Sequence, residues 1–234
     1  MSETTSIPIN IILASKSPRR KQLLEEAGVK FTVYTGTSEV DESLEPDLQR
    51  DPAEAVKKLA ERKAGAVVQD LLARNPVGLG IVIGADTTVV LDGEMMGKPY
   101  SADHAREMLA RLSGRTHEVI TGVSVWLCML NEKEENGGDG NVSLAFRSFS
   151  ETSRVTFKEL TKEDINAYVA TGETIDKAGA YGIQGKGGAL VEALEGSFNN
   201  VVGLPVETLL ENFPDLLKTH LEAEVTAQEP APEA

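Results

Sequence analysis

The sequence of 234 residues contains a single cysteine, Cys128, so it cannot form an intrachain disulfide. This scarcity fits a reducing compartment. Cys128 lies in the apolar run 125–128, which is typical of a core residue rather than of a nucleophile. The three histidines do not show the spacing of metal ligands. The sequence therefore excludes an intrachain disulfide framework and a metal centre built from histidines.

Long apolar runs are also absent. No stretch approaches the length that crosses a bilayer, and the N-terminus lacks the basic and apolar segments of a secretory signal. We therefore expect a cytoplasmic protein with no membrane partner. Basic residues are outnumbered, with 23 Lys and Arg against 37 Asp and Glu, which gives a net charge of −14. This charge disfavours nucleic acid as a partner, and a polyphosphate ligand would need a locally basic site or a metal ion.

The length suits one large domain with a substantial core. We predict a single domain over 7–218, a disordered lead at 1–6 and an acidic disordered tail at 219–234, because both ends are poor in core-forming residues. Strand and helix patterns alternate along the domain, which predicts an α/β or α+β fold. Two long strands flank the acidic, glycine-rich loop 131–141 and favour some antiparallel pairing in a mixed sheet.

Capping signals predict where the helices begin. Asp51-Pro52-Ala53-Glu54 combines a cap, a proline at the first position and an acid in the first turn, and its helix should extend to about Ala73. Ser101 and Thr161 predict two further starts, and Pro205 starts the last helix.

The turn Ser15-Lys16-Ser17-Pro18-Arg19-Arg20 lies between the apolar run 9–14 and a helical pattern at 21–27. A strand is therefore expected to end where a helix begins. The free N–H groups and the positive dipole end of a helix favour an anion, and arginine binds phosphate oxygens in bidentate fashion. Such a concentration of cations in an acidic protein indicates a phosphate site. The alternative is a well-capped helix with two surface arginines.

Asp86 interrupts the strongly apolar strand 81–91. An unpaired buried carboxylate is costly, so Asp86 should meet a cation, as a metal ligand or a general base. The alternative is a hydrogen-bonded aspartate at a bulge or strand end. Strict alternation places Thr87 on the opposite face, so Thr87 shares the site only if the strand ends or bulges there.

Two lysines are candidates for a phosphate site. Lys63 lies on the apolar stripe of the helix after Asp51, where a lysine either snorkels to solvent or delivers its charge into a cleft. Lys98 lies in the short turn Gly97-Lys98-Pro99 beyond the Asp86 strand, which by itself is more typical of a surface turn.

Gln184 lies in the glycine-rich stretch 179–188, where its amide can read the edge of a nucleotide base. The neighbouring acids Asp41 and Glu42, with Glu39, form an acidic cluster after a second apolar segment, and its carboxylates are able to share Mg²⁺ or Mn²⁺ with Asp86. A plain glycine-rich loop and a solvated acidic loop are the respective alternatives.

Taken together, these segments resemble the Maf family of nucleoside triphosphate pyrophosphatases. Their order and approximate spacing match the family over about residues 9–212. No single motif is decisive, but the ordered set is very specific. The matching segments are Leu13–Arg20, Leu59–Ala64, Gly84–Thr87, Gly97–Pro99, Leu112–His117, Thr121–Val123, Asp176–Gly185 and Asn200–Pro205.

The resemblance implies a two-lobed α/β protein, related to inosine-triphosphate pyrophosphatases, with a curved mixed sheet, flanking helices and a central cleft. It implies that a nucleoside triphosphate is hydrolysed to the monophosphate and pyrophosphate, with Mg²⁺ or Mn²⁺ as cofactor, in order to clear noncanonical nucleotides from the pool. Such enzymes are cytoplasmic and often form homodimers.

The resemblance also assigns roles to residues. Asp86 would accept the proton of the attacking water and hold the metal with Asp41 or Glu42. The triphosphate would be held by Ser15, Arg19, Arg20, Lys63 and Lys98. Arg19, Thr87 and Gln184 match the branch of the family that acts on dTTP and UTP, with modified pyrimidine nucleotides as further candidates. The rivals are a 7-methyl-GTP pyrophosphatase and a nucleotide-binding regulator of cell division or septum formation.

Overall fold

The computed structural model describes residues 3–37, 39–74, 78–130, 142–218 and 220–225. The strands are β1 (Glu3–Leu13), β2 (Thr32–Val33), β3 (Gly78–Leu91), β4 (Glu94–Met96), β5 (Thr116–Leu130), β6 (Val142–Phe157), β7 (Val191–Glu195) and β8 (His220–Val225). The α-helices are α1 (Pro18–Glu26), α2 (Pro46–Gln49), α3 (Pro52–Ala73), α4 (Ala102–Leu112), α5 (Lys162–Val169), α6 (Phe198–Val202) and α7 (Val206–Asn212). Three short 3₁₀ helices are η1 (Ala178–Ala180), η2 (Gly185–Leu190) and η3 (Pro214–Leu217).

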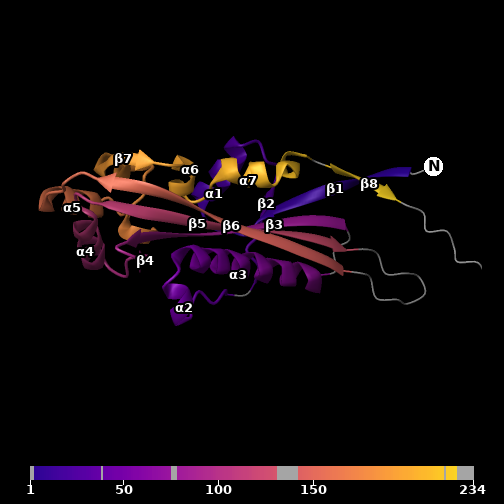
Figure 1. Ribbon diagram of the computed structural model, residues 1–234, viewed down its shortest axis with the longest axis horizontal. Coiled ribbons are helices and arrows are strands. Elements are labelled where there is room, and N and C mark those ends of the chain that lie inside the picture. Colours follow the sequence, from indigo (N-terminus) through magenta and orange to yellow (C-terminus); the bar gives the residue numbers. More distant parts are fainter. Residues whose placement is uncertain (1–2, 38, 75–77, 131–141, 219, 226–234) are drawn as a thin grey trace, which may run out of the picture.

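The sheet is mixed, as the sequence predicted. Its strand order is β2-β1-β3-β5-β6-β7, with β4 paired to β3 and β8 paired to β1. Strand β1 runs parallel to β2 and β3, whereas β3, β5, β6 and β7 pair antiparallel. Figure 1 shows the long strands running side by side, with α3 along one face of the sheet and α1, α6 and α7 along the other. The predicted α/β fold with a curved mixed sheet is confirmed.

Two large hydrophobic clusters form the core. One gathers side chains of α4, α5, β6 and η2 around Leu109, Leu112 and Phe157. The other gathers side chains of β1, α1, β3 and the segment before α7 around Leu13, Leu24 and Leu204. Because β3 contributes residues to both clusters, the polar residues of β3 lie between the two halves of the molecule.

The predicted capping residues occupy the cap positions. The Asp51 side chain accepts a hydrogen bond from the Glu54 amide at 3.2 Å, and Ser101 accepts one from His104 at 3.0 Å. Thr161 forms a capping box with Asp164. Helix α7 follows Pro205. These local hydrogen bonds satisfy N–H groups that a helix cannot pair by itself, which explains why short polar residues predict helix starts correctly.

The two ends of the described chain differ from the predicted disordered lead at 1–6 and tail at 219–234. Strand β1 begins at Glu3, and Glu3–Pro8 pairs antiparallel with His220–Val225. Hydrogen bonds between main-chain groups do not require an apolar composition, so the composition of either segment alone could not reveal this pairing. The acidic loop 131–141 lies outside the described residues, and the single domain over 7–218 stays a prediction.

Cys128 is buried, as the sequence predicted, and burial raises the pKa of its thiol. It packs with Ala64, Val67 and Val82 in a cluster between α3 and the sheet. None of the helices in the described part of the chain combines the length and the apolar character needed to cross a bilayer.

His117 is a buried histidine in the core around Phe157. Only 2% of its surface is exposed, and its Nε2 lies 2.7 Å from the Tyr181 hydroxyl. The rings of Phe157 and Tyr181 meet the imidazole edge-on. Burial lowers the pKa of His117 to about 4 from an ordinary value of 6.5. The folded protein therefore holds a neutral imidazole at pH values where the unfolded chain binds a proton.

This difference predicts a dependence of stability on pH. Because the unfolded state binds more protons between pH 6.5 and 4, the free energy of unfolding should fall as the pH is lowered through this window. His117 alone should account for a loss of about 2–3 kcal/mol. Urea unfolding at pH 7, 5.5 and 4.5 measures it. His117→Gln cannot titrate but retains a partner for Tyr181, so identical pH dependence in the two proteins would contradict the assignment.

Candidate active site

A cavity of about 810 Å³ opens beside β3 between the two halves of the core. Nine of the ten residues that the sequence predicted for the site line it: Ser15, Arg19, Arg20, Glu42, Lys63, Asp86, Thr87, Lys98 and Gln184. They come from α1, α3, β3 and four loops that are far apart in the sequence. Asp41 is the predicted residue that does not line the cavity.

The edge of β3 explains how residues on opposite faces reach one cavity. Strand β1 ends at Leu13, opposite Ile83, and β4 pairs with β3 only from Val89 onward. Within the described residues, no strand pairs with this edge of β3 in between. The cavity therefore reaches both faces around this free edge, where Asp86 lies on the α3 side and Thr87 on the α1 side.

The register of β3 and β5 is unbroken at this point, with Asp86 opposite Gly122 and Thr87 opposite Thr121. The sequence had required the strand to end or bulge if Thr87 were to share the site, and that requirement was wrong. Strand alternation describes the two faces of a sheet but not the open edge that joins them.

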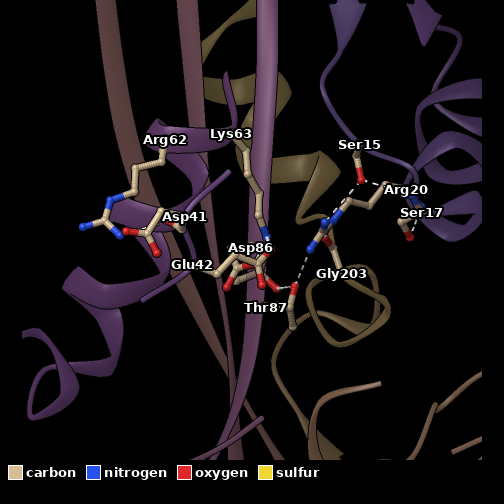
Figure 2. A network of polar contacts seen from close by, with 11 residues as sticks. Ser15, Ser17, Arg20, Asp41, Glu42, Arg62, Lys63, Asp86, Thr87 and Gly203 are labelled. Carbon is tan, nitrogen blue, oxygen red and sulfur yellow. Dashed lines mark hydrogen bonds and ion pairs between the residues drawn. The ribbon is translucent and has the colours of Figure 1, made fainter. Parts of the chain in front are cut away.

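Lys63 joins two carboxylates at the α3 side of the cavity. Its Nζ lies 2.5 Å from Asp86 Oδ1 and 2.8 Å from Glu42 Oε1. Figure 2 shows the lysine directed along β3 toward the Asp86 carboxylate. The side chains of Lys63 and Asp86 are 19% and 17% exposed, so the pair is shielded but still reachable from the cavity. Of the two alternatives for Lys63, the geometry favours delivery of its charge into a cleft.

The loop that carries Glu42 is held in place by hydrogen bonds to its main chain. Arg62 on α3 donates hydrogen bonds to the carbonyl oxygens of Asp41 and Ser43, at 3.1 and 2.5 Å. These two residues flank Glu42, so Arg62 fixes the loop on both sides of it (Figure 2). The hydrogen bond from Lys63 lowers the pKa of Glu42 against the opposing effect of burial. Sequence reasoning gave Arg62 no role, because its partners are main-chain oxygens.

The Asp41 carboxylate forms its hydrogen bond within its own loop. Its Oδ1 accepts a hydrogen bond from the Ser43 amide at 2.9 Å, and this bond lowers the pKa of Asp41. The side chain is exposed and outside the cavity. Of Asp41 and Glu42, the geometry therefore favours Glu42 as the partner of Asp86, and Glu39, the third acid of the cluster, also lines the cavity.

Arg20 is held in the cavity by three uncharged oxygens. Its Nε donates to the Gly203 carbonyl at 2.7 Å, and its terminal nitrogens donate to Thr87 Oγ1 at 3.0 Å and Ser15 Oγ at 3.3 Å (Figure 2). Burial lowers the pKa of Arg20, and the nearby Asp86 carboxylate partly offsets this effect. Among the described residues, Arg20 forms no ion pair. It is thus a fixed cation at the N-terminus of α1 whose charge is free for an anion.

A chain of hydrogen bonds ties this arginine to the sheet. Thr87 Oγ1 lies 2.9 Å from Thr121 Oγ1, which donates to the Asn200 carbonyl at 2.9 Å. The fully buried Asn200 side chain donates to the Val119 carbonyl and to Ser153 Oγ. Sequence reasoning assigned no role to Thr121 or Asn200. Thr121 is marked by a polar side chain within an otherwise apolar strand, whereas Asn200 directly follows another asparagine and has no such signal.

The cavity is locally basic although the protein is acidic. Among the described residues, six cations line it, namely Lys16, Arg19, Arg20, Lys63, Lys98 and Lys177, against the four acids Glu39, Glu42, Asp86 and Asp176. Within the described residues, Lys16 and Lys98 form neither a hydrogen bond nor an ion pair through their side chains. This excess of positive charge against a net charge of −14 suits a polyphosphate ligand.

Glu42 and Asp86 are the oxygen donors that the cavity offers to a divalent metal, and a metal between them would take the place that Lys63 Nζ now holds. Glu42 and Asp86 present carboxylate oxygens to the same point, which Lys63 Nζ occupies. Within the described residues, no group of three or more acidic, histidine or cysteine side chains is placed to hold a metal. Mg²⁺ typically takes one or two carboxylates and completes its shell with water and substrate phosphates, so two carboxylates suffice.

Comparisons with known proteins show the family of this chain. The family model described as Maf-like protein matches residues 10–216. The chain is 46% identical over 196 residues to the dTTP/UTP pyrophosphatase of Bacillus velezensis, covering 84% of this chain and 90% of the relative. It is 43% identical over 212 residues to the dTTP/UTP pyrophosphatase of Bacillus cereus (strain B4264), covering 90% and 98%. The family model over most of the chain and the identity to these relatives show that the chain belongs to the Maf family.

Proposed function

We propose that this protein hydrolyses dTTP and UTP to the nucleoside monophosphate and pyrophosphate. The observation that carries the proposal is the pair of carboxylates, Glu42 and Asp86, placed beside the fixed cation Arg20 at the free edge of β3. The names of the relatives supply the substrate. Modified pyrimidine nucleotides are included, because clearing such nucleotides from the pool is the role that this chemistry serves.

The residues of the cavity divide the chemistry between them. Asp86 accepts a proton from the water that attacks the α-phosphorus, while the bond from this phosphorus to the bridging oxygen breaks and pyrophosphate leaves. Arg20, Lys63 and Lys98 offset the charge that develops on the leaving group. Their side chains converge from α1, α3 and the loop after β4, so the triphosphate is held from three sides.

A divalent cation, Mg²⁺ or Mn²⁺, is part of the proposal. Glu42 and Asp86 are the residues that would hold it, and when bound it would neutralise phosphate charge and orient the triphosphate. The same proposal places the enzyme in the cytoplasm, where it meets the nucleotide pool. It includes a homodimer and gives no role to nucleic acid or membrane.

A substrate screen tests the proposal. Canonical and modified triphosphates are assayed with Mg²⁺ and with Mn²⁺, and pyrophosphate release is measured for each. We expect the highest kcat/KM for dTTP and UTP. A preference for 7-methyl-GTP or another purine would overturn the choice of base. Binding of nucleotides without turnover would instead support a nucleotide-binding regulator.

Arg20 should be more sensitive to substitution than its charge alone suggests. Arg20→Lys keeps a cation but loses the fork that spans Thr87, Ser15 and Gly203. We expect the KM for dTTP to rise by about tenfold or more, and inhibition by pyrophosphate to weaken by a similar factor. The matched control is Arg115→Lys, an exposed arginine paired with Asp92. Equal kinetics for Arg20→Lys and the control would refute the role of the fork.

A further inference from the structure

Arg19 and Arg20 are adjacent on α1 but are held in different ways. Arg20 is fixed by three uncharged oxygens. Among the described residues, the Arg19 side chain has one partner, Asp176, whose Oδ2 lies 3.2 Å from an Arg19 terminal nitrogen. The orientation of Arg19 in the cavity therefore depends on a residue from the far side of the cavity, in the segment before η1.

Asp176 is itself supported. Its second oxygen, Oδ1, accepts a hydrogen bond from Lys177 Nζ at 2.6 Å, and the same Nζ donates to the Glu173 carbonyl at 2.5 Å. The stem of Lys177 lies against Gly182, where a Cβ would approach its carbons to 2.9 Å. One carboxylate oxygen thus anchors Asp176 to the glycine-rich segment, and the other is left to orient Arg19.

The electrostatics of the three side chains agree with this division. Burial acts to raise the pKa of Asp176, but Lys177 and Arg19 outweigh it, so the pKa is lowered overall. The carboxylate is therefore charged at neutral pH and holds Arg19 by a charge-assisted hydrogen bond. The same segment carries Gln184 into the cavity two residues after Gly182.

We propose that Asp176 is a positioning residue for base selection, because it fixes Arg19 against the segment that carries Gln184. This inference rests on the proposed function and deepens it, since it assigns the choice of base to a contact between the two sides of the cavity. Within the described residues, Asp176 forms no hydrogen bond or ion pair with Asp86 or Arg20; its partners are Arg19 and Lys177. Its effect should therefore fall on discrimination between nucleotides rather than on the chemical step.

Simple electrostatics makes the opposite prediction. If Asp176 only contributed negative charge, Asp176→Asn would strengthen the binding of every triphosphate and of pyrophosphate by a similar factor, because it removes repulsion. A positioning role instead predicts that the variant loses selectivity, while pyrophosphate, which carries no base, binds no more weakly than before. The ratio of kcat/KM between two nucleotides, rather than the absolute rate for either of them, therefore distinguishes the two accounts.

The test compares the full-length protein with Asp176→Asn, Arg19→Gln and the double variant. For dTTP, UTP, CTP and GTP, both kcat/KM and the equilibrium Kd are measured, together with inhibition by pyrophosphate. We expect Asp176→Asn to lower the ratio of UTP to GTP by about tenfold, mainly through KM. The double variant should be no less selective than Arg19→Gln alone. The control is Asp103→Asn, an exposed aspartate paired with Arg106.

Each result decides the inference. An unchanged ratio in Asp176→Asn, or independent effects in the double variant, would overturn it while leaving the pyrophosphatase intact. Absence of turnover in the wild type would overturn the proposed function, and the Kd values would still report whether Asp176 governs discrimination. A wild type that binds all four nucleotides equally would overturn the positioning role. Unfolding measured for each variant excludes a loss of structure as the cause.

Discussion

Replacing Asp86 by asparagine should lower kcat for dTTP by about 10²- to 10⁴-fold. Asparagine has nearly the same shape as aspartate but cannot take a proton from water. Asp86 lies on β3 at its free edge, with its carboxylate 2.5 Å from Lys63 and 17% exposed to the cavity. The Glu42 carboxylate, on a loop and 54% exposed, approaches Lys63 from a different direction and should not substitute for it.

The matched control is Asp92→Asn, in the turn directly after the same strand. Asp92 is exposed, pairs with Arg115 and takes a positive φ of 55°, which asparagine also tolerates. Both variants are compared in a steady-state assay of pyrophosphate release, with unfolding measured in parallel. Turnover of Asp86→Asn within about threefold of the control would remove Asp86 from the catalytic role.

Replacing Gly122 by alanine should destabilise the protein by about 3 kcal/mol or more. A Cβ at Gly122 would lie 2.4 Å from the Val56 carbonyl carbon and 2.5 Å from the Lys57 amide nitrogen of α3. Both are backbone atoms, so α3 itself would have to move away from the sheet. Gly84 on β3 shows the same close approach, with the Ala60 carbonyl oxygen at 2.4 Å.

This close approach links stability to the site, because α3 carries Lys63 and Arg62. Urea unfolding measures the loss for Gly122→Ala, and the matched control is Gly80→Ala in β3, where a Cβ would make only ordinary contacts at 3.9–4.0 Å. A displaced α3 should also weaken turnover in the folded variant by moving Lys63 from Asp86. Equal free energies of unfolding for the Gly122 and Gly80 variants would show that α3 moves away from the sheet without loss of stability, which would contradict the prediction.

Gly84 and Lys63 show which features of the site the sequence could predict and which it could not. Gly84 lies two residues before Asp86 on β3, and the structure places the backbone of α3 directly against it, with the Ala60 carbonyl oxygen 2.4 Å from where a Cβ would lie. The apolar stripe of α3 predicted that Lys63 faces inward but could not choose between solvent and cleft. That choice depends on where Asp86 and the loop of Glu42 meet it, which is a long-range contact that local periodicity does not contain.

Other features of the site had no local signal. Arg62 acts through main-chain oxygens, and Thr121 and Asn200 act through a buried chain of hydrogen bonds across three elements. Asp176 begins one of the segments that resemble the Maf family, but sequence reasoning gave it no role of its own. Residue identity predicts which groups are able to bind phosphate, whereas the supports of these groups become visible only when the strand order is known.

The most direct test of the central claim is the identity of the products. Phosphorus NMR of dTTP incubated with the protein and Mg²⁺ or Mn²⁺ distinguishes the two bonds that water can break. The site described here predicts dTMP and pyrophosphate in equal amounts, and their loss in Asp86→Asn. Formation of dTDP and orthophosphate, or equal yields of dTMP and pyrophosphate from the wild type and the variant, would contradict it.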